Sequence, residues 1–133
     1  MVTLAEQKLR AIRFLENLNA VDPAVFEDLI AENFRFEIVS ALREFPPIEG
    51  RKNFAMTECT LLKRLFPEGL KLRLETVIAE GDFVAATAEA DTTAMNGRRY
   101  RQRYNFFLRF EGDLIAEGRE YNDTNLIREV FLT

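Results

Sequence analysis

The residues with the most obvious chemical potential are carboxylates that fall on the apolar face of a predicted β-sheet. Asp91 and Asp123 share one predicted row across this sheet, with Gln102 between them and no basic residue in the row. Neighbouring strands lie about 4.8 Å apart, so the two carboxylates are on the order of 10 Å apart, with room for a water or a small substrate group. Because a carboxylate is costly to bury unpaired, we predict Asp91 and Asp123 as catalytic acid and base.

Other polar residues on this face support the same hypothesis. Glu89 is two residues from Asp91, and repulsion between two carboxylates in an apolar site raises at least one pKa, which suits acid–base catalysis. The alternatives are an ion pair between Glu89 and Arg119, and a helix cap at Asp123. Tyr104 is predicted to donate a positioning hydrogen bond, with a role as a core aromatic residue as its alternative. The predicted substrate pocket also includes Glu89, Leu72, Leu74, Gln102, Phe106, Arg119 and Tyr121.

The amino-acid composition excludes several other kinds of catalytic site. The chain has no histidine, which excludes Ser-His-Asp and Cys-His catalysis and His-ligated metals, so no cofactor or metal is expected. The single cysteine, Cys59, cannot form an internal disulfide, and no cationic and apolar leader precedes the first predicted helix, so we expect a reducing, cytoplasmic location. A net charge of -4 argues against nucleic acid as a partner. No run approaches the roughly 20 apolar residues that span a bilayer.

Residues 70–123 position these side chains, because they are predicted to form four consecutive strands. The turns are Gly81-Asp82, Asn96-Gly97 and Gly112-Asp113, and Asn-Gly between alternating apolar residues is a strong hairpin signal. With two-residue turns, Glu89 lies opposite Tyr104, and all three turns agree on one apolar sheet face. A three-residue loop at either Gly-Asp turn would break this agreement.

The remaining elements are predicted to be helices that cover this apolar face. Helices are expected over residues 4–19, after the N-cap and proline at Asp22-Pro23, and over residues 51–66. A strand is expected over residues 34–38, a loop that forms a lid or rim over residues 41–49, and a short helix or extended tail over residues 126–131. We therefore predict a single α+β domain over residues 1–133, in which a curved antiparallel sheet wraps helices as a cone.

This order of elements resembles the SnoaL-like and ketosteroid-isomerase-like superfamily, which shares its fold with nuclear transport factor 2. The most specific parts are the run 48–51 (Ile-Glu-Gly-Arg), Asp113-Leu114-Ile115 and the closing run 119–123 (Arg-Glu-Tyr-Asn-Asp). The resemblance covers nearly the whole chain and implies the cone-shaped fold. The superfamily includes isomerases, dehydratases, cyclases, hydrolases and binding modules, so the resemblance identifies the fold better than the reaction.

Within this superfamily, the limonene-epoxide-hydrolase branch is the nearest chemical match. Asp91 and Asp123 fall on its two aspartates, whereas Glu89 stands at the position of its arginine. Ketosteroid isomerases use a carboxylate base with a tyrosine and a neutral aspartic acid, parts that Asp91, Tyr104 and Asp123 match in kind. We predict an isomerase, lyase or hydrolase that acts on a small apolar or amphipathic molecule. The alternative is a non-catalytic ligand-binding or dimeric interaction domain, which Glu89 favours.

The outer face of the sheet suggests a homodimer. Ala86, Ala88 and Ala90 are predicted to form a flat strip beside Asn105 and Phe107, which suits sheet-on-sheet packing. The resemblance implies the same assembly. A homodimer through the outer sheet face is therefore expected.

Overall fold

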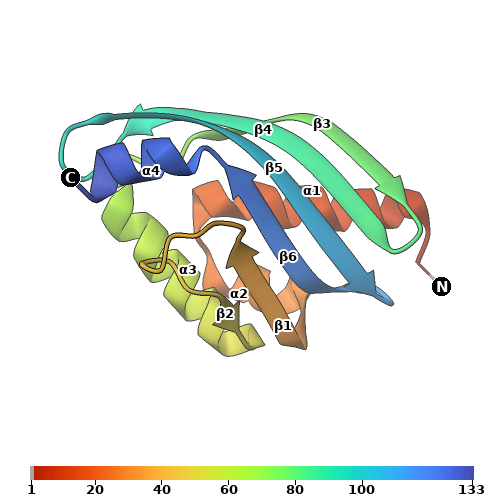
Figure 1. Cartoon of the computed structure of the whole chain (residues 1–133). Coiled ribbons are helices and arrows are strands. Elements are labelled where there is room, and N and C mark those ends of the chain that lie inside the picture. The colour runs from red at the N-terminus through yellow and green to blue at the C-terminus, as the bar shows by residue number, and fades with distance from the viewer. Residues whose placement is uncertain (1) are drawn as a thin grey trace.

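A six-stranded curved sheet wraps three helices, and a fourth helix lies at its end (Figure 1). The computed structural model describes residues 2–133, and its strands follow the order β2-β1-β6-β5-β4-β3, with β1 parallel to β6 and the other neighbours antiparallel. The elements are α1 (Leu4–Ala20), α2 (Pro23–Leu29), β1 (Ile30–Ile38), β2 (Ile48–Glu49), α3 (Arg51–Leu65), β3 (Leu72–Glu80), β4 (Phe83–Thr93), β5 (Arg99–Glu111), β6 (Leu114–Asn122) and α4 (Thr124–Phe131).

The predicted helices and the predicted α+β fold class are confirmed. The Thr3 side chain accepts a hydrogen bond from the Glu6 amide and caps α1, and Asp22 caps α2 in the same way through the Ala24 amide. The segment after residue 123 is a helix rather than a tail. The structure adds the short strand β2 at the end of the predicted loop, where Ile48 pairs with Phe36.

The core between the helices and the sheet is built on a cluster of phenylalanines. Phe14 of α1, Phe26 of α2, Phe34 of β1 and Phe54 of α3 are all 0% exposed, and their ring centroids lie 4.8–5.9 Å apart wherever two rings pack together. Aromatic pairs at these distances add stability beyond the area that they bury. This cluster fixes the three helices against the concave face of the sheet.

The hairpin between β4 and β5 has a three-residue loop instead of the predicted two-residue turn. The Ala94 amide donates to the Arg98 carbonyl at 2.8 Å, which leaves the three residues between them as the loop. Gly97 has a φ of 82°, the left-handed conformation with which such loops end. The Asn96 amide group donates to the Val130 carbonyl of α4 at 2.7 Å, so contact with α4 holds the longer loop in place.

This extra loop residue reverses the predicted faces of β4. Glu89 pairs with Arg103 instead of Tyr104, and a shift of one residue moves every side chain of a strand to the opposite face. Ala86, Ala88 and Ala90, which were expected on the outer face, are therefore buried on the concave face. The strand β3 changes register as well, at an irregularity between Leu74 and Thr76. The prediction that Glu89 and Asp91 lie on the apolar face is wrong.

A second irregularity turns the end of β6. The register of β6 against β5 changes between Arg109 and Phe110, so that Glu120 lies opposite Phe106 and its side chain faces the core. Gly118 follows this bulge, and a Cβ there would lie 2.9 Å from Cδ1 of Phe36, which leaves no room for a side chain. Glycine inside a strand often marks a bulge or a close approach of this kind. Tyr121, predicted on the apolar face, is consequently 41% exposed.

None of the helices between residues 2 and 133 combines the length and the apolar character that a membrane span requires.

Candidate functional site

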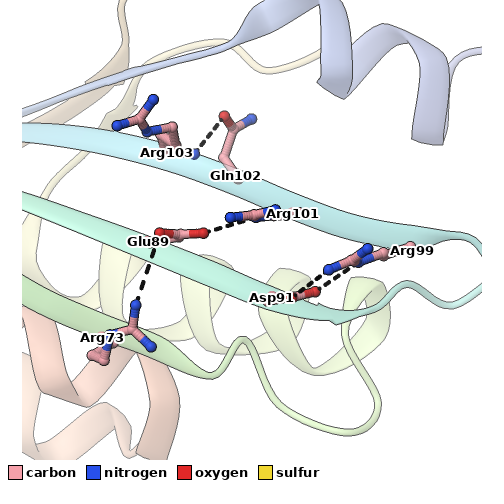
Figure 2. Close-up of polar contacts among 7 residues, drawn as sticks. All are labelled: Arg73, Glu89, Asp91, Arg99, Arg101, Gln102 and Arg103. Atoms are coloured by element: carbon pink, nitrogen blue, oxygen red, sulfur yellow. Dashed lines mark hydrogen bonds and ion pairs between the residues drawn. The ribbon is translucent and has the colours of Figure 1, made fainter.

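The carboxylates predicted as the centre of the site belong to an ion-pair ladder on the outer face of the sheet (Figure 2). The Glu89 carboxylate accepts a 2.9 Å hydrogen bond from Nε of Arg101, and Nη2 of Arg73 lies 3.8 Å away. Asp91 accepts two hydrogen bonds from Arg99, at 3.0 and 2.8 Å. These hydrogen bonds lower the pKa of both carboxyl groups, so both stay ionised at neutral pH. Glu89 does not pair with Arg119.

Asp123 has the role of a helix cap. Its Oδ1 accepts hydrogen bonds from the amides of Asn125 and Leu126 at the start of α4, and the residue is exposed. Gln102 is fully buried, and its side-chain amide exchanges two hydrogen bonds with the backbone of Asp123, at 3.0 and 2.9 Å. The predicted row of Asp91, Gln102 and Asp123 is therefore not present.

The other residues predicted for the pocket lie in the core of the domain or on the outer face of the sheet. Leu72 and Phe106 are buried in the core, and Leu74 packs against its edge. Arg119 faces outward, where its Nε lies 3.1 Å from Oε1 of Glu117. Of all the residues predicted for the site, Tyr104 alone lines the internal cavity described next.

A small cavity lies under the concave face of the sheet, between β5, β6, α3 and α4. Its volume is about 50 Å³ and its walls are mostly apolar, from Leu18 of α1 to Phe131 of α4. Four lining residues carry polar groups. They are Glu58, Tyr100, Tyr104 and Glu120.

Glu120 reaches the cavity because the bulge in β6 turns it inward. Nδ2 of Asn122, the next inward-facing residue on the strand, donates to Oε2 of Glu120 at 2.7 Å. Burial raises the pKa of Glu120 to about 7, and the hydrogen bond from Asn122 opposes this shift. A carboxyl group with this pKa exists in both protonation states near neutral pH, as general acid–base catalysis requires.

Glu58 enters the same cavity from the opposite wall. It lies on the buried face of α3, one helical turn after Phe54, and is 6% exposed. No hydrogen bond or ion pair to its carboxyl group is found among residues 2–133. Burial, together with the charge of Glu120, raises the pKa of Glu58 to about 8. Glu120 therefore ionises first, and its charge helps to keep Glu58 protonated.

Two tyrosines complete the polar side of the cavity. The hydroxyl oxygens of Tyr100 and Tyr104, two residues on the same face of β5 and four apart in the sequence, are 2.6 Å apart. Burial raises the pKa of both, so both are neutral hydrogen-bond donors at neutral pH. When Tyr100 donates to Tyr104, the Tyr104 hydroxyl proton is free to point at a ligand.

The arrangement combines a base, a neutral acid and a hydrogen-bond donor in an apolar space. When two carboxyl groups in the same site have different pKa values, the group with the lower pKa can act as the base and the other as the acid. Around the cavity, Glu120 has the lower pKa of the two and Glu58 the higher. Within residues 2–133, no group of three or more acidic or cysteine side chains is placed to hold a metal ion. The carboxyl groups of the cavity can transfer protons, and its phenol groups can donate hydrogen bonds.

The sequence analysis missed three of the four polar residues, Glu58, Tyr100 and Glu120, although Glu58 and Glu120 each left a signal. Glu58 follows Phe54 by four residues and precedes Leu61 by three, so helical periodicity places it on the apolar face of α3. Gly118 inside an otherwise regular strand indicated a bulge, and a bulge before Glu120 turns its side chain inward.

Comparisons with known proteins agree with the fold. The sequence matches the family model described as a SnoaL-like domain over residues 11–118. No curated protein sequence matches the chain significantly.

Solved structures of several kinds are similar to this chain. An LEH-like epoxide hydrolase from M. tuberculosis is 17% identical, with a TM-score of 0.78 over 97% of this chain and 91% of that one. A protein from Bacillus subtilis assigned as an isomerase is 22% identical, with a TM-score of 0.81 over 98% and 96% of the two chains. A de novo designed protein with a curved β-sheet is 14% identical, with a TM-score of 0.70 over 97% and 94%. At these identities the likeness shows the fold alone, so the reaction must be argued from the cavity.

Proposed function

The chain belongs to the SnoaL-like domain family, and we propose that it is an enzyme that transfers a proton within a small, largely apolar carbonyl compound. An isomerase is the simplest such enzyme, and a lyase uses the same first step. The observation that carries this proposal is that Glu120, Glu58 and Tyr104 line one apolar cavity, with the pKa of the two carboxyl groups raised to about 7 and about 8.

The first step is removal of a proton from the carbon next to the carbonyl group. Ionised Glu120 takes this proton, the C–H electron pair forms a new C=C bond, and the carbonyl π electrons move to its oxygen. The Tyr104 hydroxyl and the neutral carboxyl of Glu58 donate hydrogen bonds to the negative oxygen that forms. Protonated Glu120 then returns the proton to a different carbon in an isomerase, or the enolate expels a leaving group in a lyase.

The surroundings of these groups favour this chemistry. The cavity is apolar apart from its four polar side chains, and hydrogen bonds to a developing charge are stronger where water is excluded. Asn122 positions Glu120 through its 2.7 Å hydrogen bond. Asp91 and Asp123, the pair predicted to bracket a water, do not line the cavity, so an isomerase or lyase is favoured over an epoxide hydrolase.

A non-catalytic ligand-binding domain is the second candidate. The observation that favours it is the size of the cavity, because about 50 Å³ is smaller than the roughly 300–1,000 Å³ of common ligand pockets. In that case the polar groups would recognise a ligand without changing it.

The exchange of hydrogen for deuterium separates the two candidates. An enzyme that forms an enolate should exchange the α-protons of a bound ketone in D₂O faster than buffer does, even when the ketone is not its natural substrate. A panel of enolisable ketones is followed by proton NMR with and without the protein. Binding of a ketone without any protein-dependent exchange would contradict the proposed enzyme and support the second candidate.

We also propose a homodimer through the outer face of the sheet. The alanine strip predicted for this contact is buried, but another apolar patch takes its place: Ile78 is 61% exposed, and the rings of Phe83 and Phe107 stack at 5.1 Å. The neighbouring ladder of alternating arginines and carboxylates allows charge pairing between two copies of this face.

Sedimentation at micromolar concentration tests the homodimer. The expected species has twice the 15.4 kDa mass of the chain, and Phe107→Glu is expected to give the monomer because it buries a charge in the contact. A wild-type chain that sediments only at 15.4 kDa would contradict this proposal.

A further inference from the structure

A second hollow opens on the surface next to the internal cavity. This hollow, called the groove here, has a volume of about 570 Å³ and lies between α3, the 39–47 loop that joins β1 to β2, and the end of α4. The groove and the cavity share six lining residues, so the two spaces adjoin. These residues are Ile38, Phe45, Glu58, Leu61, Leu65 and Phe131.

We infer that the groove binds the apolar remainder of a substrate whose reacting carbonyl end enters the cavity. The inference rests on the proposed function and extends it by naming the substrate class. The substrate is an elongated, amphipathic carbonyl compound with a polar reacting end and an unbranched or flat apolar tail.

The sizes of the two spaces support this division. A water molecule needs roughly 10–15 Å³ of such volume, so a cavity of about 50 Å³ holds a functional group and a few attached atoms. The groove, at about 570 Å³, lies within the range of roughly 300–1,000 Å³ that is common for small-molecule sites. Neither space alone offers both the reacting groups and the room for a substrate.

The walls of the groove match an apolar tail. Phe36, Ile48, Pro46 and Pro47 form one side, and Met95 and Leu132 form part of the other. Met95 is 54% and Leu132 is 38% exposed, so large apolar side chains stand open to solvent where a ligand would cover them. Burial of apolar surface from water provides the binding free energy.

Glu58 and two aromatic side chains lie where the tail must pass. Glu58 lines both spaces, so the neutral acid stands beside the passage and next to the reacting carbonyl group. Phe131 is held by the rings of Phe66 and Tyr100, at 5.7 and 5.8 Å. Phe45 lies in the loop, packs against the edge of the core and has no ring partner in the part of the chain that the structure describes, so we expect Phe45 to move when a ligand connects the groove to the cavity.

The test uses a series of methyl ketones from butanone to 2-nonanone. Dissociation constants are measured by calorimetry and α-proton exchange is measured separately by NMR. For the wild type, each added methylene is expected to lower Kd about 4-fold until the groove is filled.

Two matched variants on α3 locate the tail. Thr57 is exposed and lines the groove, whereas Thr60 is exposed and lines neither space. Thr57→Phe is expected to fill the groove and weaken binding of 2-nonanone at least 10-fold with little effect on butanone. Thr60→Phe, which adds the same side chain outside the groove, is expected to bind both ketones as the wild type does.

The outcomes separate this inference from the proposed function. A Kd that does not depend on chain length, or a Thr57→Phe variant that binds 2-nonanone as tightly as the wild type does, would overturn the role of the groove. In a third outcome, Kd depends on chain length in the wild type but not in Thr57→Phe, and no ketone exchanges its α-protons. This outcome would establish the groove as a binding site and refute the proposed enzyme.

Discussion

Replacing Glu120 by glutamine is expected to lower the rate of α-proton exchange by about 10²–10⁴-fold, the usual contribution of a positioned general base. Glutamine keeps the size of the side chain and its contact with Asn122, but it cannot accept the proton. The variant should remain folded, because a neutral group replaces a carboxyl whose pKa burial already raises to about 7. Exchange rates from NMR, with circular dichroism as the check on folding, make this measurement.

The pH dependence of the α-proton exchange rate of the wild type tests the role of Glu120 independently. The rate is expected to rise as the pH passes about 7, where Glu120 loses its proton, and to fall above about 8, where Glu58 loses the proton that it donates. Because the two groups interact, these apparent pKa values belong to the pair. Glu120→Gln should lose the rise on the acidic side.

Asp91→Asn is the matched control for this experiment. It also removes one carboxylate from the sheet, but that carboxylate lies on β4 and pairs with Arg99 on the outer face (Figure 2). The rate for Asp91→Asn is therefore expected to equal that of the wild type. If Asp91→Asn lost the activity and Glu120→Gln kept it, the assignment from the sequence would be right and the cavity assignment wrong.

The fold could be predicted from the sequence because its signals are local and redundant. Thr3 and Asp22 are helix caps with their helices directly after them, and the helix 51–65 ends before Pro67. The concave face of β5 was also predicted correctly, since Tyr104, Phe106, Leu108 and Phe110 occupy every second position of one strand whatever the length of the neighbouring loops.

The site could not be predicted in the same way because it depends on register. One extra residue in the loop around Asn96 moves Glu89 and Asp91 outward, and one bulge in β6 moves Glu120 inward. The loop is also held by a contact between Asn96 and the carbonyl of Val130, 34 residues later in the chain. A contact of this range cannot be inferred from turn residues alone.

Glu58→Gln is expected to change how the free energy of unfolding depends on pH. The pKa of Glu58 is raised from 4.5 to about 8 in the folded protein, so the folded state binds more protons than the unfolded state between these values. The free energy of unfolding of the wild type therefore falls as the pH rises from about 5 to about 8, with a slope from this group of up to about 1.4 kcal/mol per pH unit. Glutamine resembles the protonated acid and cannot ionise, so this part of the slope disappears.

Urea unfolding followed by circular dichroism between pH 5.5 and 8.5 measures the slope. Between pH 5.5 and pH 8.5 the stability of the variant relative to that of the wild type should rise by on the order of 3 kcal/mol. Glu120, with a pKa of about 7, leaves a smaller slope in the variant. Glu16→Gln, which replaces an exposed glutamate of α1, is the control and should leave the slope of the wild type unchanged.

Equal slopes for the wild type and Glu58→Gln would mean that Glu58 is ionised and hydrated in the folded protein at neutral pH. Glu58 would then place a negative charge beside the oxygen that gains charge during proton removal, and this charge would oppose the reaction. The pH dependence of unfolding therefore tests, without any substrate, whether Glu58 is available as the neutral hydrogen-bond donor that the proton transfer requires.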